Sequence, residues 1–175
     1  MTERLTVAII PARGGSKRIA RKNIRPFLGV PLVARPIQTL IESAIFDYVV
    51  VSTDDDEIAA IAEAAGAWVP FRRPAELADD FTPTVPVILD AADRVEALSG
   101  TINRNNLDAI AVNFNEYNTV SSFSIIYDDS IKWKSTREFA LSLSDSLGLN
   151  PARWQYSTTN KKPNPKSEIY FSCTN

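Results

Sequence analysis

Short apolar runs alternate with longer amphipathic segments along the first half of the chain. The run Leu5–Ile10 is rich in β-branched residues, which is typical of a strand buried in a parallel sheet. Asp47–Thr53 has the same character, and Trp68–Phe71 predicts a third, shorter strand. Strands separated by helix-length segments predict an α/β fold, here a Rossmann-like three-layer sandwich with a mostly parallel sheet and helices on both faces.

Amphipathic segments separate and follow these runs. Residues 31–46 predict a helix, although Pro36 should end or kink its first turns. The apolar positions that repeat at helical spacing in this segment are Leu32, Leu40, Ile41 and Ala44. Residues 55–67 and 85–98 predict two further helices.

The helix predicted over residues 55–67 has signals at both of its ends. Asp55 or Asp56 should cap its N-terminus, and Gly66 should end it. The run Asp54–Asp56 could also suggest a metal site. Consecutive carboxylates at a strand-to-helix junction more often cap the helix and meet the positive end of its dipole, so we favour the cap.

The second half of the chain has a weaker pattern. Leu107–Phe114 predicts a central strand, the alternation over residues 120–129 predicts another, and Ile169–Cys173 predicts a last one. Residues 137–148 fit either a helix or a charged loop. Residues 157–168 are polar and contain proline, so they predict a loop.

Composition limits the classes of function. A chain of 175 residues with 45% hydrophobic and 23% charged residues suits one globular domain over residues 1–175. The net charge of −2 provides no general basic field, which argues against a nucleic-acid partner. No apolar run reaches the roughly 18 residues of a membrane span, and the N-terminus lacks a signal peptide's apolar core. The single cysteine, Cys173, fits a reducing compartment, so we expect a cytoplasmic protein without a membrane partner.

The absence of histidine from the chain narrows its chemistry. Acid–base catalysis by histidine and metal sites built on histidine are excluded. Carboxylates, lysine, metal-bound water or the substrate itself remain as proton-transfer groups, and the sequence does not choose among them.

The stretch IIPARGGSKRIARKN, residues 9–23, holds the strongest candidate chemistry. It follows the first predicted strand, where open parallel sheets bind their ligands. Two glycines let its backbone turn and expose amide groups, and basic side chains can bind phosphate oxygens. These residues are Gly14, Gly15, Arg13, Lys17 and Lys22. The stretch suits a triphosphate, although it matches neither the P-loop nor the GxGxxG pattern, and a solvated basic surface stays open as the alternative.

Three stretches of this chain, in order, resemble the cytidylyltransferases that activate nine-carbon acidic sugars. They are IIPARGGSKRIARKN, FDYVVVSTDDDEIAAIAEAAGA and PFRRPAELADDFTPT. The family comprises the CMP-sialic acid synthetases and their pseudaminic and legionaminic acid relatives, and the resemblance covers about residues 5–95. It implies a fold of the nucleotide-diphospho-sugar transferase type. Residues 1–98 would form its nucleotide-binding half, and residues 99–175 a diverged or truncated half for sugar binding and dimerisation.

The resemblance implies a reaction in which CTP and a nonulosonic acid give the CMP-sugar and pyrophosphate. The anomeric hydroxyl of the sugar attacks the α-phosphorus, and Mg²⁺ serves as the cofactor that neutralises the phosphates. Positioning and electrostatics do most of the work in such chemistry, which is consistent with a motif of donors rather than nucleophiles.

The resemblance also implies roles for single residues. Arg13 and Lys17 would contact the triphosphate, and Lys22 would stabilise charge at the α-phosphate, so Arg13 and Lys22 are the catalytic candidates. The rest of the nucleotide-binding loop would consist of Gly14, Gly15, Ser16 and Asn23. Arg73 would read the cytosine, and Thr84 would place a hydroxyl beside the base.

Simpler roles exist for some of these residues. Arg73 could cap a neighbouring strand or pair with Glu76, and Thr84 could N-cap the helix that follows it. Asp79 and Asp80 could form an acidic cluster, but we favour a solvated loop.

The later motifs of the family are less clear in this chain. Asn113–Thr119 reads NFNEYNT where relatives have a PTSP-like loop. The aspartate pair that holds magnesium in relatives is expected beyond Asn175, so the metal ligands stay unassigned. Two alternatives therefore remain: an impaired or truncated homologue that binds nucleotide without turnover, and a synthetase of the CMP-Kdo type.

The resemblance further implies a homodimer in which one subunit completes the sugar site of the other. Residues 120–155 are where such an extension would lie. Their apolar side chains could form that surface or belong to the domain's own core, and both readings stay open. These side chains are Phe123, Ile125, Ile126, Trp133 and Trp154.

Overall fold

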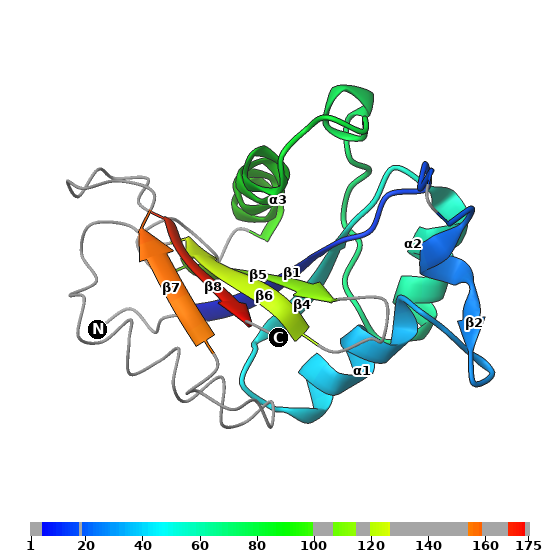
Figure 1. Cartoon of the computed structure of the whole chain (residues 1–175), viewed down its shortest axis with the longest axis horizontal. Coiled ribbons are helices and arrows are strands. Elements are labelled where there is room, and N and C mark those ends of the chain that lie inside the picture. Colours follow the sequence, from blue (N-terminus) through cyan, green and yellow to red (C-terminus); the bar gives the residue numbers. More distant parts are fainter. Residues whose placement is uncertain are drawn as a thin grey trace.

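The computed structural model of the chain describes residues 5–17 and 19–99 in full, and four later strands by their backbone alone (Figure 1). The strands are β1 (Leu5–Pro11), β2 (Pro26–Phe27), β3 (Val30–Pro31), β4 (Tyr48–Ser52), β5 (Leu107–Phe114), β6 (Val120–Ile126), β7 (Trp154–Thr158) and β8 (Glu168–Cys173). The α-helices are α1 (Ala34–Glu42), α2 (Asp56–Ala64) and α3 (Thr84–Ser99), and two 3₁₀ turns are η1 (Lys22–Ile24) and η2 (Ala75–Leu77).

A six-stranded sheet in the order β4-β1-β5-β6-β8-β7 forms the centre of the molecule. β1 lies between β4 and β5 and is parallel to both. β6 is antiparallel to β5, β8 is antiparallel to β6, and β7 is antiparallel to β8, so four of the six strands run in one direction. The predicted α/β fold with a mostly parallel sheet is confirmed.

Alternate residues of β1 face two hydrophobic cores, because successive side chains of a strand point to opposite faces. Val7 and Ile9 lie in a cluster with residues of α3, whereas Ala8 and Ile10 lie in a cluster with residues of α1 and α2. Figure 1 shows α3 on one side of the sheet and α1 on the other. The three-layer arrangement therefore follows from a strand that is apolar at consecutive positions.

Helix α1 differs from the prediction in the effect of Pro36 and in the residues that it buries. Pro36 does not end the helix: α1 begins at Ala34, so Pro36 lies in its first turn, where a missing N–H costs little. The buried residues of α1 are Ala34, Pro36, Ile37 and Leu40. Of the predicted stripe only Leu40 is buried in the helix, since Ile41 is exposed and Ala44 lies beyond the helix with a φ of 54°.

The predicted strand Trp68–Phe71 does not form. Only Trp68 pairs with β4, with its amide donating to Val49 at 2.8 Å and its carbonyl accepting from Val51 at 3.1 Å. Pro70 has no N–H with which to extend the ladder, and Phe71 turns into the core beneath α3.

A short hairpin of β2 and β3 was not predicted. Its two central residues, Leu28 and Gly29, have φ values of 51° and 80°. Positive φ at both positions is the geometry that lets a two-residue turn match the twist of its strands. Leucine seldom adopts it, which is why the sequence pattern did not indicate this hairpin.

The remaining predictions have mixed outcomes. Gly66 follows the end of α2 with a φ of 97°, as predicted. The strands predicted in the second half correspond to β5, β6 and β8, whereas β7 was not predicted. Residues 137–148 lie outside the described residues, as does most of the loop predicted over residues 157–168. Within the described part of the chain, no helix is long and apolar enough to cross a bilayer.

Two isoleucines one turn apart on α1 provide a matched test of its packing. The side chain of Ile37 is 0% exposed and that of Ile41 is 44% exposed. Ile37→Ala should lower the free energy of unfolding by about 2–5 kcal/mol, because it leaves a cavity in the core. Ile41→Ala should lower it by less than about 1.5 kcal/mol, since the same change removes less buried surface. Urea denaturation measures both, and equal losses would contradict the observed helix orientation.

Candidate functional site

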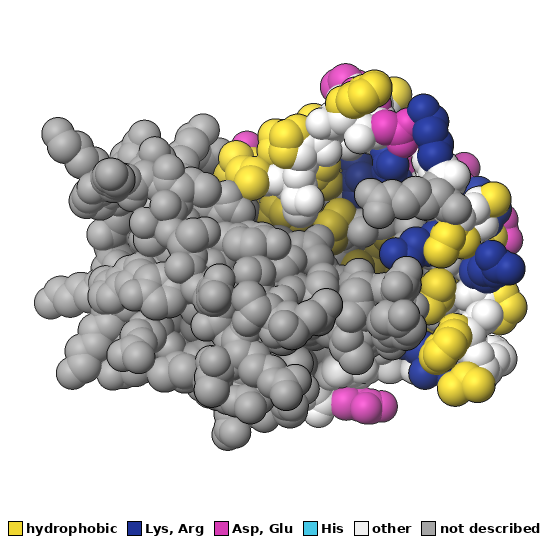
Figure 2. Space-filling model, viewed as in Figure 1, with side chains coloured by type: hydrophobic (Ala, Val, Ile, Leu, Met, Phe, Trp, Pro, Cys, Tyr) yellow, Lys and Arg dark blue, Asp and Glu magenta, His cyan; other side chains and the backbone are white. Residues whose placement is uncertain are grey.

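The carboxyl ends of β1 and β4 meet at one edge of the sheet. Pro11 pairs with Ser52, and the amide of Ala12 donates to the carbonyl of Ser52 at 3.0 Å. The described residues of the loop after β1, 12–17 and 19–22, therefore lie against the junction between β4 and α2. This is the edge at which open α/β sheets bind ligands. Figure 2 shows Lys and Arg side chains around a hollow on the right of the molecule, with acidic side chains at its upper edge.

The loop after β1 is held closely against that junction at Gly14. The amide of Gly14 donates to Oδ1 of Asp54 at 2.9 Å. A Cβ at Gly14 would lie 2.6 Å from Oδ2 of Asp55, whereas a Cβ at Gly15 would have no neighbour within 4 Å. The first glycine of the motif is thus required for close approach of the backbone, while the second is not.

Asp55 joins helix α2 to the loop after β1. Its Oδ1 accepts hydrogen bonds from the amides of Glu57 and Ile58, both at 3.0 Å, so the predicted helix cap is confirmed and Asp55 provides it. The carboxylate also forms an ion pair with Arg21, which pairs with Glu57 as well. The amide of Ile58 and the guanidinium of Arg21 lower the pKa of Asp55 from its ordinary value.

Asn23 closes the base of the loop. Its side-chain Nδ2 donates to the carbonyl of Arg13 at 2.8 Å, and its carbonyl accepts from the amide of Val33, also at 2.8 Å. Ser16 turns back within the loop, with its amide donating to the carbonyl of Gly14 at 3.0 Å. These contacts fix the loop's shape, and the nucleotide contacts expected of both residues stay predictions.

Arg73 is buried at the end of β4, with only 6% of its surface exposed. Its Nε donates to Oγ of Ser52 at 3.1 Å, and its Nη2 donates to the Ser52 carbonyl. Of its two simpler roles, the strand-end contact is present, and Arg73 bonds to Ser52 rather than to Glu76. Burial lowers the pKa of Arg73 from its ordinary value, which the nearby Asp54 carboxylate partly opposes. A buried cation at a ligand-binding edge is a functional candidate.

The remaining two candidates lie at the ends of their elements. Lys22 is half-buried, and it ends the loop and begins η1. Thr84 is exposed and is the first residue of α3 rather than the residue before it, so the helix starts one position earlier than expected.

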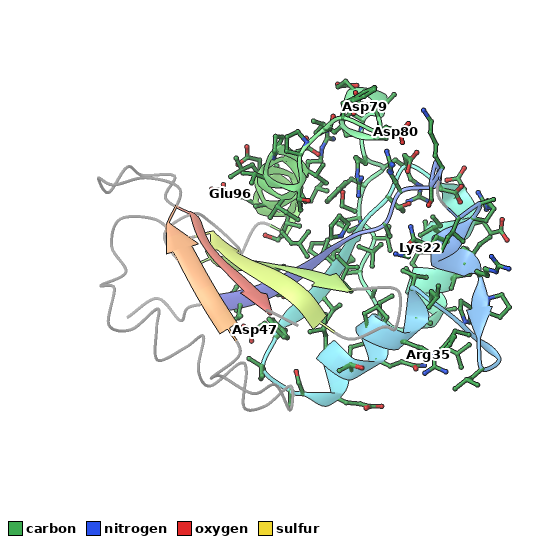
Figure 3. All side chains as sticks on the ribbon, viewed as in Figure 1. Lys22, Arg35, Asp47, Asp79, Asp80 and Glu96 are labelled. Carbon is green, nitrogen blue, oxygen red and sulfur yellow. The ribbon has the colours of Figure 1, made fainter. Side chains whose placement is uncertain are left out.

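Asp79 and Asp80 lie on an exposed loop, as predicted, and both also contact basic residues of the loop after β1. Oδ1 of Asp80 lies 2.6 Å from Nη2 of Arg13, and its Oδ2 forms an ion pair with Lys17. The backbone carbonyl of Asp79 also accepts from Arg13. Figure 3 shows both aspartates on the segment before α3, above the loop after β1. The sequence offered one signal for these contacts: it contains an acidic pair, Asp79 and Asp80, and a basic loop that needs negative partners.

Of the predicted loop residues, Gly14 contacts the β4–α2 junction and Asn23 bonds to Arg13. Arg13 and Lys17 contact Asp80. The backbone of Arg73 reaches the same junction by donating to the Thr53 carbonyl at 2.8 Å. The sequence did not indicate Asp54 and Arg21 as members of this arrangement. Among the described residues, no group of three or more histidine, cysteine, aspartate and glutamate side chains could hold a metal ion.

The two glycines of the loop can be compared directly. Gly14→Ala should lower the free energy of unfolding by about 1–3 kcal/mol, because the new methyl group would overlap Asp55. Gly15→Ala should change it by less than about 0.5 kcal/mol, since the space there is open. Chemical denaturation of the two variants measures the difference. If both variants were as stable as the parent chain, the close packing of the loop on Asp55 would be disproved.

Substitutions of Asp55 separate its cap from its charge. Asp55→Asn keeps a capping oxygen, whereas Asp55→Ala should cost a further 0.5–2 kcal/mol or so at any pH. Because the folded pKa of Asp55 is lowered, its ionised form stabilises the fold above about pH 3.9, and this contribution is lost as the pH falls through the folded pKa. The deficit of Asp55→Asn in denaturant unfolding should therefore shrink below about pH 4. A deficit that stays constant into stronger acid would contradict the ion pair with Arg21.

Comparisons with known proteins identify relatives of the first half of the chain. The pseudaminic acid cytidylyltransferase of Campylobacter jejuni is 47% identical over 91 residues, which cover 52% of this chain and 39% of that protein. The CMP-N,N'-diacetyllegionaminic acid synthase of the same species is 46% identical over 87 residues, or 50% of this chain and 37% of that protein. The chain spans well under half the length of these curated relatives.

Two solved structures share the fold. A CMP:2-keto-3-deoxy-manno-octonic acid synthetase complexed with CTP superposes with a TM-score of 0.51 at 16% identity, covering 97% of this chain and 74% of that one. A cytidylyltransferase from Leptospira borgpetersenii has a TM-score of 0.50 at 21% identity, covering 97% and 61%. The nucleotide-sugar transferase type of fold is thereby confirmed.

A family model described as cytidylyltransferase matches residues 7–97, which run from within β1 into the last turn of α3. The match includes the loop after β1, the β4–α2 junction and Arg73, and it agrees with the resemblance over about residues 5–95. The chain belongs to the cytidylyltransferase family.

Proposed function

We propose that the chain is an enzyme that transfers CMP from CTP to a nine-carbon acidic sugar and releases pyrophosphate. The observation that carries this proposal is the placement of Arg13 near the buried guanidinium of Arg73 at the end of β4. Lys17 lies on the same loop as Arg13 and shares its contact with Asp80. Related sequences support it, since those described as pseudaminic acid cytidylyltransferase and legionaminic acid synthase share this region.

The cations of the loop would bind the triphosphate. The guanidinium of Arg13 can donate two parallel hydrogen bonds to phosphate oxygens, and the side chain of Lys17, which is 79% exposed, can reorient to meet them. Lys22, at the end of the loop, would stabilise the charge that develops at the α-phosphate. The Gly14 amide is engaged by Asp54, so it shapes the loop rather than serving the ligand.

Arg73 would recognise the cytosine. Its contacts with Ser52 use Nε and Nη2, so its orientation is set before a ligand arrives. Cytosine presents acceptors at O2 and N3, which suit an arginine donor, and the Thr84 hydroxyl would lie beside the base. Burial strengthens any hydrogen bond that a base makes here, because the effective dielectric constant is low.

The reaction itself requires little covalent chemistry from the protein. The anomeric oxygen of the sugar would form a bond to the α-phosphorus while the bond from that phosphorus to the bridging oxygen breaks, and pyrophosphate leaves with the bond's electrons. The hydroxyl proton would pass to a base that we do not assign. Mg²⁺ would accompany the triphosphate and neutralise part of its charge. The described residues offer no three-ligand group for it, so we assign it no protein ligand.

The sugar, the assembly and the location are further parts of the proposal. We propose a sialic, pseudaminic or legionaminic acid as acceptor, a homodimer as the assembly and the cytoplasm as the compartment. The relatives' descriptions support the sugar class, and a single cysteine fits a reducing compartment. The side chains of residues 120–155 lie outside those that the structure describes, so the dimer rests on the resemblance alone.

Nucleotide selectivity tests the role of Arg73. With magnesium present, CTP should raise the melting temperature, and UTP, ATP and GTP should not. Ligand at about 100 times its Kd adds roughly 2.7 kcal/mol of stability. Arg73→Lys keeps the charge but loses the guanidinium fork, and should weaken CTP binding at least about tenfold in titration calorimetry. Arg72→Lys is the control, since Arg72 is exposed and pairs with Asp56. Equal effects of both variants, or stabilisation by all four nucleotides, would refute base reading by Arg73.

Pyrophosphate release separates the proposal from its alternatives. With CTP and magnesium, release should depend on a nonulosonic acid from a panel of sialic, pseudaminic and legionaminic acids. Release only with the eight-carbon acid Kdo would favour the CMP-Kdo type. Selective CTP binding without release on any of these sugars would favour a homologue that does not turn over.

A further inference from the structure

A single carboxylate bridges the two cations that the proposed function assigns to the triphosphate. Oδ1 of Asp80 contacts Arg13 and Oδ2 contacts Lys17, so each oxygen meets a different cation. A phosphate group bound there would use its oxygens in the same manner. The pKa of Asp80 is lowered from its ordinary value by these two cations, Lys17 first, which is consistent with an ionised bridge.

We propose that Asp80 is an internal competitor for the triphosphate, and that it sets the affinity of the site for polyphosphate ligands. This inference rests on the proposed function, because it takes Arg13 and Lys17 as the triphosphate ligands. A nucleotide must displace the Asp80 carboxylate before it can engage both cations. Its apparent affinity is then reduced by the fraction of molecules in which the cations are already released.

The segment that carries Asp80 has its own internal structure. Oδ1 of Asp79 accepts hydrogen bonds from the amides of Phe81 at 2.9 Å and Thr82 at 2.6 Å. The Thr82 hydroxyl donates to the carbonyl of Glu76 at 3.2 Å. The turn therefore keeps its own hydrogen bonds when Asp80 leaves the loop. What it gives up are the contacts with Arg13 and Lys17, including the one at the Asp79 carbonyl.

The exposure of these groups keeps the competition mild. The side chain of Lys17 is 79% exposed and that of Asp80 is 22% exposed, so water and salt screen the bridge. Each exposed ion pair of this kind changes an equilibrium constant by a factor of about 1.4 to 5. Two such pairs would therefore weaken the apparent affinity for a polyphosphate by roughly 2- to 25-fold. A triphosphate carries several negative charges against one, so it can displace Asp80 and still bind.

The bridge also bears on pyrophosphate release. After transfer, pyrophosphate would hold the two cations, and the Asp80 carboxylate is tethered beside them at high effective concentration. Its return would accelerate departure of this product. An arrangement in which Asp80 merely holds Arg13 and Lys17 ready for the ligand would have the opposite consequence, because removing the carboxylate would then weaken binding.

Calorimetric titration of Asp80→Asn distinguishes competition from positioning. The variant keeps the shape of the side chain and removes its charge. We expect CTP, inorganic tripolyphosphate and pyrophosphate to bind about 2- to 25-fold more tightly than to the parent chain. Cytidine, which has no phosphate to meet these cations, should bind equally to both. The control is Glu76→Gln, which removes one charge from an exposed residue of the same segment, and it should leave all Kd values within about twofold.

Every other outcome overturns either the competition by Asp80 or the proposed function. If the parent chain binds CTP and Asp80→Asn binds it no more tightly than Glu76→Gln does, competition by Asp80 is refuted while the proposed function stands. Weaker polyphosphate binding by Asp80→Asn would show positioning instead. If Asp80→Asn tightened cytidine binding as well, the effect would not arise at the phosphates. If the parent chain and both variants melt cooperatively but bind neither CTP nor tripolyphosphate, the proposed function fails and this inference fails with it.

Discussion

The parallel register of β1 and β4 is the constraint on which the candidate site depends. Pairing of Pro11 with Ser52 brings the two strands to an end at the same edge, and the amide of Ala12 continues the ladder onto the Ser52 carbonyl. Ser52 also accepts hydrogen bonds from the guanidinium of Arg73. A slip of one residue would turn the apolar side chains of β4 to the wrong face and separate Gly14 from Asp54. The cores on both faces therefore enforce the geometry of the site.

Carboxylates organise the basic loop from two directions. The β4–α2 junction supplies Asp54 to the Gly14 amide and Asp55 to Arg21, and the segment before α3 supplies Asp80 to Arg13. These pairs offset the mutual repulsion of closely spaced cations. They differ in how strongly they are tied to the fold. Asp55 also caps a helix, whereas the side-chain contacts of Asp80 in the described part of the chain are with Arg13 and Lys17. Asp54 and Asp55 thus suit a structural role, whereas the Asp80 carboxylate is suited to being displaced by a ligand.

Local signals in the sequence predicted elements whose causes are local. The carboxylate run predicted a helix cap. Asp55 provides it, because its Oδ1 accepts hydrogen bonds from the amides of Glu57 and Ile58 in the first turn of α2. The Trp68–Phe71 strand failed at Pro70, which the pattern of apolar residues could not weigh against pairing. The β2–β3 hairpin was missed because Leu28 adopts a positive φ without a glycine. Strand β7 was missed because its alternation of Trp154 and Tyr156 with Gln155 and Ser157 covers only five residues.

The sequence by itself determined the order of the main strands and helices of the first half, the place of the basic loop and the family, because apolar periodicity, glycines and charged motifs act within short stretches of chain. Only the tertiary structure decided which groups meet across long separations. Arg13 reaches a carbonyl 66 residues away at Asp79, and Arg73 reaches Ser52 across 21 residues. Those contacts depend on how β1 and β4 pair within the sheet and on how the three helices pack against its two faces. For that reason the cytosine-reading candidate and the competing carboxylate could be placed only in three dimensions.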